Sequence, residues 1–247
     1  MLEMLLTNNF SNKRNDKMEF KDRKKDILDI LYAKGRVSVS SLAKTLFVSE
    51  MTIRRDLSEL EKKGVLKRYR GGAVLTAVSS EMPISQRFFV DENKKIFLAK
   101  KAVKFLEDGL SVFIDSSSTC QYIIPYISRF KNITLITNSV NALLIASKSQ
   151  MPCILIGGKY CDKDMCFVGS MAEQSAEQFN VDVAFFSAMG LSEDGIISDP
   201  DIEQSMIRKI IMEHSKKNIF LFEEGKLNQK YFYTICHKNA VDYIITA

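Results

Sequence analysis

The segment Ser49-Glu50-Met51-Thr52-Ile53-Arg54-Arg55-Asp56-Leu57 decides how the first part of this chain folds. Ile53, Leu57 and Leu60 recur at spacings that place them on one side of a helix. The two adjacent arginines of the segment then point to other sides. We therefore predict a helix whose apolar stripe is docked and whose arginines can reach phosphate groups.

The residues on either side extend this helix into a small domain. Residues 23–34 have apolar residues at helical spacing and end at Gly35, and Ser38 can cap a second short helix. A tight turn then leads to Ser49, which can cap the basic helix. Two short helices joined in this way form a helix-turn-helix, whose second helix enters the major groove of DNA. Residues 65–75 read as two strands around a basic, glycine-containing tip, which predicts a wing.

This run of residues closely resembles the DNA-binding domain of the DeoR family of bacterial repressors. The matching positions are Arg36-Val37-Ser38-Val39, Leu42-Ala43, Val48-Ser49, Thr52 to Leu57, Leu60-Glu61, Gly64 and Gly71-Gly72-Ala73. The alternative is an ordinary three-helix domain whose arginines form a solvated face, but a match of this length favours DNA binding. The expected DNA-binding residues are Ser49, Thr52, Arg54, Arg55, Lys67, Arg68 and Arg70.

The charge of the chain is unevenly distributed. The formal net charge is +5 over 247 residues, but residues 1–76 have a net charge of +7 and the other 171 residues one of −2. A basic first part is the electrostatic footprint that a polyanion requires. The chain has no apolar run long enough for a membrane span and no secretory signal pattern, so we expect a cytoplasmic protein.

The five cysteines do not suggest a disulfide framework or a metal site. They are scattered through a chain expected in the cytoplasm, and neither histidine falls at zinc-finger spacing. We expect them to be small core or loop residues, with no metal and no cofactor.

The remaining chain predicts a tail, a linker and an α/β domain. Residues 1–20 have no helical or strand period, and residues 77–92 contain a helix breaker at Pro83. We therefore expect a disordered tail at 1–20, a winged helix-turn-helix domain at 21–76, a linker at 77–92 and a sensor domain at 93–247.

From residue 93 short apolar strands alternate with helices. This pattern predicts a mostly parallel sheet covered on both faces. The expected strands are 110–114, 133–137, 153–156, 183–188 and 219–222, and the expected helices end near Gly109 or span 122–130, 142–146, 171–179 and 202–214.

Polar residues follow these strands, where a parallel sheet binds its ligands. Asp115 to Thr119 place successive hydroxyls before a helix, and hydroxyls with free N–H groups at a helix start can hold a phosphate. Each such piece taken alone is more typical of a helix cap or a turn than of a binding site. The placement of such polar residues after successive strands favours a site for a phosphorylated sugar.

The resemblance to the DeoR family continues through this part of the chain, with matches from Lys95 to Lys226. It implies a sensor domain similar in fold to ribose-5-phosphate isomerase that binds a sugar phosphate. The effector-binding residues that it implies are Asp115, Ser116, Ser117, Ser118, Thr119, Thr137, Asn138, Gly157, Gly158 and Lys226. We therefore expect a repressor of carbohydrate metabolism genes that binds operator DNA as a homo-oligomer and responds to a phosphorylated sugar.

This chain departs from the family pattern at three places. Ser117 stands where the family commonly has Gly, Glu223-Glu224-Gly225 replaces Asp-Ser-Ser, and Ala247 stands where an Asp usually follows the Thr. If position 117 needs a positive φ, the loop geometry must differ.

The rival hypothesis is an enzyme. A sugar-phosphate isomerase or hydrolase could use Asp115 or Glu203 as general base, but no partner acid can be assigned from the sequence. Sensing is the more economical use of a pocket attached to a DNA-binding domain. We therefore assign no catalytic residue.

Overall fold

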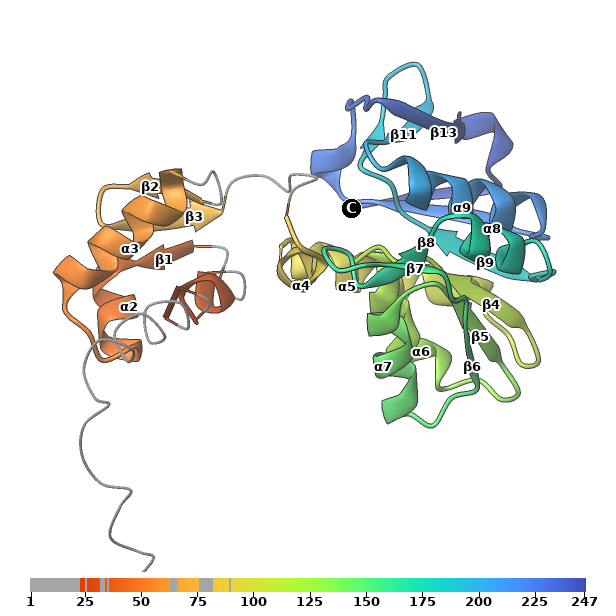
Figure 1. Ribbon diagram of the computed structural model, residues 1–247, viewed down its shortest axis with the longest axis horizontal. Helices are drawn as coiled ribbons and strands as arrows, with labels where there is room; N and C mark the ends of the chain where they lie inside the picture. The colour runs from red at the N-terminus through yellow and green to blue at the C-terminus, as the bar shows by residue number, and fades with distance from the viewer. Residues whose placement is uncertain are drawn as a thin grey trace, which may run out of the picture. The chain divides into compact units, whose positions relative to one another are not determined.

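The computed structural model describes residues 23–24, 26–31, 34, 36–62, 66–75, 82–88 and 90–247. The chain divides into two compact units, residues 1–77 and 78–247, which are considered separately (Figure 1). The tail expected at residues 1–20 lies outside the described residues. Within the described part of the chain, no helix has the length and apolar character needed to cross a membrane.

The N-terminal unit is a winged helix-turn-helix, as the sequence predicted. The described residues between Arg23 and Lys34 are helical. They are followed by β1 (Arg36–Ser38), α2 (Val39–Thr45), α3 (Glu50–Lys62), β2 (Leu66–Tyr69) and β3 (Gly72–Leu75). The sequence did not predict β1, which pairs with the wing hairpin to give an antiparallel sheet of order β1-β3-β2.

Local chemistry explains why these elements begin where they do. The Ser38 hydroxyl accepts a hydrogen bond from the Ser41 N–H at 3.1 Å, and the Ser49 hydroxyl accepts one from the Thr52 N–H at 3.2 Å. Each serine therefore satisfies one of the unpaired donors at a helix start. Gly72 allows β1 to lie close, because a Cβ at this position would stand 2.0 Å from the Val37 carbonyl oxygen.

The C-terminal unit is built on a parallel sheet of six strands in the order β14-β12-β9-β4-β5-β6. These strands are β4 (Ser111–Ile114), β5 (Thr134–Thr137), β6 (Cys153–Leu155), β9 (Val183–Phe186), β12 (Asn218–Phe222) and β14 (Tyr243–Thr246). Helix α5 (Glu92–Ala102) precedes the first of these strands in the chain. Between the strands lie α6 (Ile124–Ile127), α7 (Val140–Lys148), α8 (Ser170–Ala176) and α9 (Ile202–Glu213).

Successive residues of each central strand enter opposite cores, as the pleat of a strand requires. Val112 and Ile114 pack with α5, α6 and α7, whereas Phe113 packs with α8 and α9. Both faces of the sheet are therefore covered, as predicted (Figure 1). This arrangement also brings the carboxyl ends of the strands to one edge, where the polar residues gather.

Several elements differ from the prediction. Two-stranded and three-stranded antiparallel additions are formed by β7 (Lys159–Cys161) with β8 (Cys166–Val168), and by β10 (Gly190–Leu191), β11 (Ile196–Asp199) and β13 (Tyr233–His237). The helix expected at 122–130 is instead a 3-10 turn at Cys120–Ile123 followed by the short α6. Pro125 stands in the first turn of α6, where proline is tolerated, and its ring prevents an α-helix from running through it.

A short helix also lies within the range expected to be a linker. This helix, α4 (Ile84–Arg87), has Ile84 fully buried, and the Ile84 N–H donates to the Lys163 carbonyl at 2.8 Å. The end of the expected linker is therefore packed against the C-terminal unit. The other expected segment boundaries remain predictions.

Candidate functional site

Helix α3 has one buried side and one exposed side. Ile53 and Leu57 are fully buried and Leu60 nearly so, which confirms the predicted stripe. The same side includes Asp56, whose fully buried carboxylate accepts a hydrogen bond from the Arg23 guanidinium at 2.7 Å. This ion pair joins the first helix to α3, and the sequence pattern had not singled it out.

The expected DNA-binding residues on α3 are exposed or half-buried. Arg54 and Arg55 are exposed, and the Arg54 guanidinium donates to the Glu50 carboxylate at 3.0 Å. Both partners of that pair are about half exposed, at 57% and 49% of their side chains, so the pair is weak. Arg54 can therefore exchange Glu50 for a phosphate. Thr52 is half-buried, and its hydroxyl lies 2.9 Å from that of Ser49.

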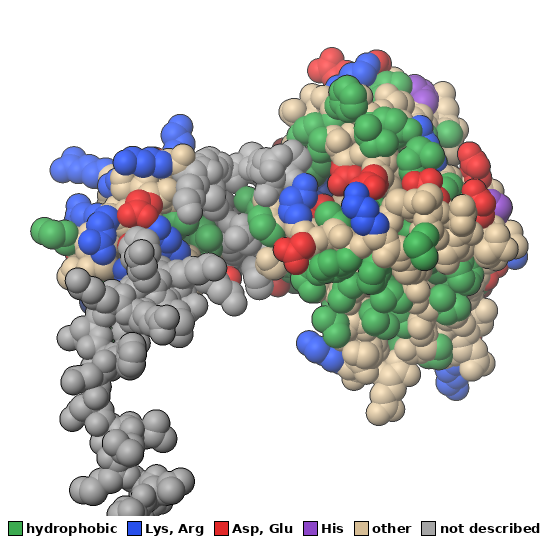
Figure 2. Space-filling model, in the orientation of Figure 1, with side chains coloured by type: hydrophobic (Ala, Val, Ile, Leu, Met, Phe, Trp, Pro, Cys, Tyr) green, Lys and Arg blue, Asp and Glu red, His purple; other side chains and the backbone are tan. Residues whose placement is uncertain are grey.

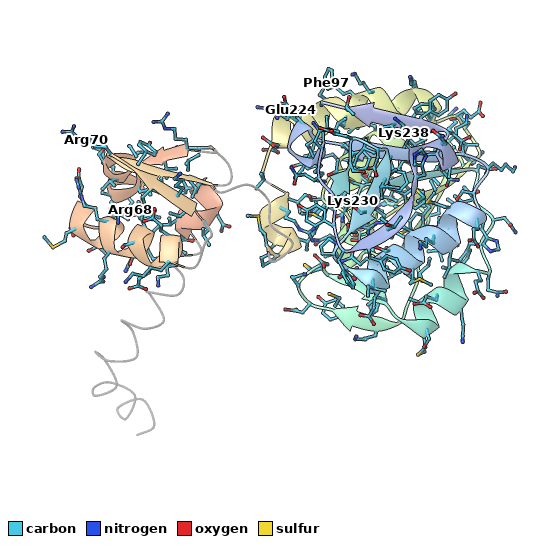
Figure 3. All side chains as sticks on the ribbon, turned by 90° about the horizontal axis from the view of Figure 1, so that it is seen from above. Arg68, Arg70, Phe97, Glu224, Lys230 and Lys238 are labelled. Carbon is cyan, nitrogen blue, oxygen red and sulfur yellow. The ribbon has the colours of Figure 1, made fainter. Side chains whose placement is uncertain are left out.

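The wing holds three exposed basic residues. Lys67 and Arg68 lie on β2, and Arg70 lies at the tip, where Gly71 has a φ of +98°. A glycine adopts this left-handed conformation readily, so the tight turn is favoured. Figure 3 labels Arg68 and Arg70 on this unit, and Figure 2 shows Lys and Arg side chains over much of its visible surface. The geometry is that of a basic surface with a helix and a wing.

In the C-terminal unit, Asp115 follows β4 and is already fully engaged. Its carboxylate accepts hydrogen bonds from the Ser117 N–H at 3.0 Å, the Ser187 N–H at 3.0 Å and the Arg208 Nε at 3.1 Å. The Ser117 hydroxyl donates to it as well. Only 2% of Asp115 is exposed. The carboxylate therefore fixes the loop and the buried Arg208 and has little capacity left for a sugar hydroxyl.

The hydroxyls of residues 116–119 face different partners. Ser116 donates to the Gln204 side chain at 2.8 Å, and Thr119 donates to the Glu223 carboxylate at 2.8 Å. The Ser118 hydroxyl accepts from the Lys95 ammonium at 3.2 Å. The φ of Ser117 is not positive, so this loop does not need the glycine that the family commonly has. The Ser117 hydroxyl instead accepts from the Cys120 N–H at 3.2 Å and fixes the turn.

Lys95, Glu223 and Lys226 form a buried charged cluster beside this loop. Lys226 lies 2.8 Å from the Glu223 carboxylate, whereas Lys95 lies 3.9 Å from it. Burial raises the pKa of Glu223, but Lys226 and Lys95 outweigh that effect and bring it to about 2. Burial lowers the pKa of Lys95 to about 8, because Glu223 only partly compensates for the lost water. Lys95 is therefore a buried cation whose charge Glu223 balances only in part.

A second charged group lies across the same pocket. Arg208 of α9 contacts Asp115 and also the Asp199 carboxylate at 3.3 Å, and these acids keep its pKa raised despite burial. Arg87 of α4 pairs with Asp164, which lies between β7 and β8, and Lys95 donates to the Arg87 carbonyl. One side chain thus ties α4 to the β7–β8 hairpin.

These groups line one pocket. Its lining residues are Arg87, Lys95, Ser117, Ser118, Ser187, Ala188, Met189, Asp199, Arg208, Glu223 and Lys226. Of the residues expected to bind an effector, the structure brings Ser117, Ser118 and Lys226 into this lining. Asp115, Ser116 and Thr119 are not part of the lining. Asp115 contacts Arg208 and Thr119 contacts Glu223, both of which line the pocket. Ser116 contacts Gln204, which in turn contacts Arg208.

Two other expected contacts lie outside the pocket lining. Thr137 donates to the Ile114 carbonyl at 2.7 Å, and the Asn138 amide donates to the Phe167 carbonyl at 2.9 Å. A Cβ on Gly158 would meet Ala172 and Val168 at 2.8 Å, whereas one on Gly157 would meet no atom within 4 Å. These contacts give Thr137, Asn138 and Gly158 structural roles in joining β4, β5, β8 and α8.

Sequence reasoning missed Arg87, Lys95, Asp199, Arg208 and Glu223 as lining residues. Lys95 had been matched only as part of the family pattern, and Glu223 only as a departure from it. Arg208 lies within the helix expected at 202–214, and no role was assigned to it. Arg87, Lys95 and Arg208 are placed by partners far away in the sequence, Asp164, Glu223 and Asp115 respectively, so no local pattern reveals these contacts.

The possible catalytic bases and metal ligands are also placed by the structure. Glu203 is partly exposed and pairs with Lys159 at 3.0 Å, and Asp115 is held by Arg208. Within the described ranges, no group of three His, Cys, Asp or Glu side chains is arranged to hold a metal ion. All five cysteines are free thiols.

Comparisons with known proteins cover nearly the whole chain. Residues 23–78 match the DeoR-like helix-turn-helix domain, and residues 90–247 match the DeoR C-terminal sensor domain. The lactose phosphotransferase system repressor of Staphylococcus epidermidis is 31% identical over 91% of this chain and 91% of its own length. The repressor GlcR of Bacillus subtilis is 31% identical, covering 89% of this chain and 85% of its own length. The glycerol-3-phosphate regulon repressor of Escherichia coli is 26% identical, covering 93% and 91%.

Solved structures give a more distant similarity. A D-ribose-5-phosphate isomerase in complex with phospho-erythronic acid matches 55% of this chain and 54% of its own, with 22% identity and a TM-score of 0.42.

Proposed function

The chain belongs to the DeoR family of transcriptional regulators, and from this premise we propose that it represses genes of carbohydrate metabolism until a phosphorylated sugar binds its C-terminal unit. Relatives that are similar over almost the whole chain are repressors named for the lactose phosphotransferase system and for the glycerol-3-phosphate regulon. As a DNA-binding regulator it would act in the cytoplasm. We further propose that it works as a homo-oligomer, which presents several DNA-binding units to repeated half-sites.

The N-terminal unit supplies the DNA contacts in this proposal. Helix α3 enters the major groove with Ser49, Thr52, Arg54 and Arg55, and the wing residues Lys67, Arg68 and Arg70 contact backbone phosphates. The exposure of the five basic side chains supports this assignment. Residues 21–76 form the DNA-binding domain, 77–92 the linker and 93–247 the sensor in the proposed organisation.

Lys95 is the single observation that carries the effector proposal. It is a buried ammonium whose pKa is lowered by burial to about 8, and Glu223, whose carboxylate lies 3.9 Å away, offsets this only in part. A phosphate in the pocket would supply the missing negative charge, and charge-assisted hydrogen bonds of this kind are strong. Lys226 and the hydroxyls of Ser117 and Ser118 line the same space and complete the phosphate site. Asp199 and Glu223 also line this space, and each is held there by donors of the protein.

The remaining expected residues support the pocket in this proposal. Asp115, Ser116 and Thr119 hold the loop and its partners, while Thr137, Asn138, Gly157 and Gly158 shape the strand ends behind it. Because Asp115 is fully hydrogen-bonded and Glu203 is paired with Lys159, neither is poised as a general base. We therefore propose sensing rather than turnover. Conversion of ribose 5-phosphate by the purified chain, abolished in Asp115→Ala with DNA binding intact, would favour the isomerase alternative.

The test measures DNA binding and effector response in the same samples. Fluorescence anisotropy would follow the full chain on the DNA upstream of its own gene, with a panel of sugar phosphates. We expect one sugar phosphate to weaken specific binding. Arg54→Ala with Arg55→Ala should abolish DNA binding and leave effector binding unchanged.

Two lysine variants separate the pocket from general charge effects. Lys95→Met should bind DNA as the parent does but lose its response to the sugar phosphate. Lys101→Met removes an exposed charge on the same helix and should keep the response. Equal responses from the parent and Lys95→Met would remove Lys95 from the phosphate site.

A further inference from the structure

Two large apolar side chains stand exposed at the beginning of α3. Phe47, in the turn before the helix, is 93% exposed, and Met51, in its first turn, is 80% exposed. They are the most exposed large hydrophobic residues among those that the structure describes in the N-terminal unit. Figure 2 shows a hydrophobic side chain projecting among Lys and Arg on the surface of this unit.

The stability of the unit does not account for Phe47. Its φ is +53°, in the left-handed region where a side chain is strained and glycine is favoured. A phenylalanine in this conformation that packs against almost nothing loses backbone freedom and buries no surface in return. Strained backbone that brings no packing often marks a functional position.

Helix geometry shows where Met51 points. Successive residues of an α-helix turn by about 100°, because a turn takes about 3.6 residues. Met51 therefore lies nearly opposite the centre of the buried stripe of Ile53, Asp56, Leu57 and Leu60, on the same side as the exposed Arg55. That is the side which a recognition helix presents to base edges, and its N-terminal residues reach deepest.

The major groove offers these side chains one apolar partner. Among the groups that base pairs present there, the C5 methyl of thymine is apolar and the others are hydrogen-bond donors or acceptors. Contacts from basic side chains to backbone phosphates carry no sequence information, whereas an apolar contact to a methyl group does.

We propose that Phe47 and Met51 contact thymine methyl groups in the operator and are specificity-determining residues of this repressor. The inference rests on the proposed DNA-binding function of α3. Arg54, Arg55 and the wing then supply affinity, and the two apolar side chains select thymine over cytosine at the positions that they cover.

The test removes single methyl groups from DNA. Binding sites are selected from random duplexes with the full-length chain, and each thymine of the selected site is then replaced in turn by deoxyuridine, which lacks only the methyl. Anisotropy should show that one or two of these replacements weaken binding by about fourfold. A loss of this size corresponds to the free energy of burying one methyl-sized group. In Phe47→Gly with Met51→Gln, the same replacements should have no effect.

The variants are chosen so that unfolding cannot explain the result. Glycine relieves the left-handed conformation at 47, and glutamine forms helices well, so the unit should remain at least as stable. Phe232→Ala removes a phenylalanine that is 83% exposed in the C-terminal unit, and it should keep the parent's sensitivity to the methyl.

The outcomes distinguish this inference from the proposed function. Sequence-selective binding that ignores every thymine methyl, or that loses the same affinity in parent and variant, overturns the inference and leaves the repressor assignment standing. Failure to select any sequence overturns both.

Discussion

Lys95 illustrates how much one buried side chain can decide. Its ammonium donates to Ser118 and to the Arg87 carbonyl, but the nearest carboxylate lies too far away to compensate fully for burial. The group is positively charged below its pKa of about 8 and neutral above it.

This pKa predicts a pH-dependent effector affinity. The sugar phosphate is already dianionic above about pH 6, so between pH 7 and pH 9 the change comes from Lys95 losing its charge. The favourable contribution is present below pH 8 and is lost as the pH rises through 8. Isothermal titration calorimetry should give about tenfold weaker binding at pH 9 than at pH 7. Lys95→Arg, which stays charged, should flatten this dependence, and a flat profile in the parent chain would contradict the assignment.

Asp56 provides a prediction about stability. Asp56→Asn leaves the Arg23 guanidinium beside a neutral group in a position where the carboxylate is fully buried. We expect the free energy of unfolding of the N-terminal unit to fall by about 2 kcal/mol. Hydrogen exchange of the α3 amides reports this unit alone. Glu59→Gln, which changes a partly exposed pair with Lys24, should lower it by less than about 1 kcal/mol. Equal losses in the free energy of unfolding for the two variants would show that the buried pair stabilises the unit no more than the partly exposed pair does.

At the scale of elements, two adjacent glycines after β6 offer a matched comparison. Gly158→Ala would drive a methyl group against Ala172 and the Val168 carbonyl, whereas Gly157→Ala meets open space. Overpacking of this kind costs about 1–3 kcal/mol. Urea unfolding should therefore show a clear loss for Gly158→Ala and almost none for Gly157→Ala. An unchanged effector response in Gly157→Ala would further mark this turn as structural, and a lost response would return it to the binding site.

The sequence predicted the elements whose signal is local. The stripe of Ile53, Leu57 and Leu60 needs one buried side, and the short apolar strands β4, β5, β9 and β12 need burial on both faces, so each is recognisable from its own residues. By contrast β7 and β8 have only three residues each, and β13 mixes polar and apolar residues. Their strand conformation is imposed by a partner strand, which a local pattern cannot show.

Only part of the candidate pocket could be predicted, because only some of its residues have a local sequence signal. Ser117 and Ser118 follow a recognisable strand, and the position of the loop follows from the topology rule for parallel sheets. Arg208 and Arg87, however, lie on helices and are held at the pocket by ion pairs. Arg208 pairs with Asp115 and Asp199. Arg87 pairs with Asp164. Those pairings join residues between 9 and 93 positions apart in the chain.

At the scale of the whole molecule, effector and DNA binding must be reciprocal. If a sugar phosphate lowers the affinity for operator DNA by a given factor, the operator lowers the affinity for that sugar phosphate by the same factor. For couplings of this kind the factor is about 5 to 150. Titrating the effector into the free chain and into the chain–operator complex measures how much the operator changes the effector affinity. Anisotropy with and without effector measures how much the effector changes the operator affinity. Unequal factors would show that further states, such as a change of oligomer, take part.

Arg87 combines two tasks in one residue. Its side chain lines the pocket and pairs with Asp164, its carbonyl accepts from Lys95, and it ends α4, the first described element of the C-terminal unit. In evolutionary terms, a change at this position alters the pocket lining and the contact between α4 and the β7–β8 hairpin together. Ser117 and Ser118 line the pocket without that second task. Adaptation to a new sugar should therefore begin at the two serines and reach Arg87 last.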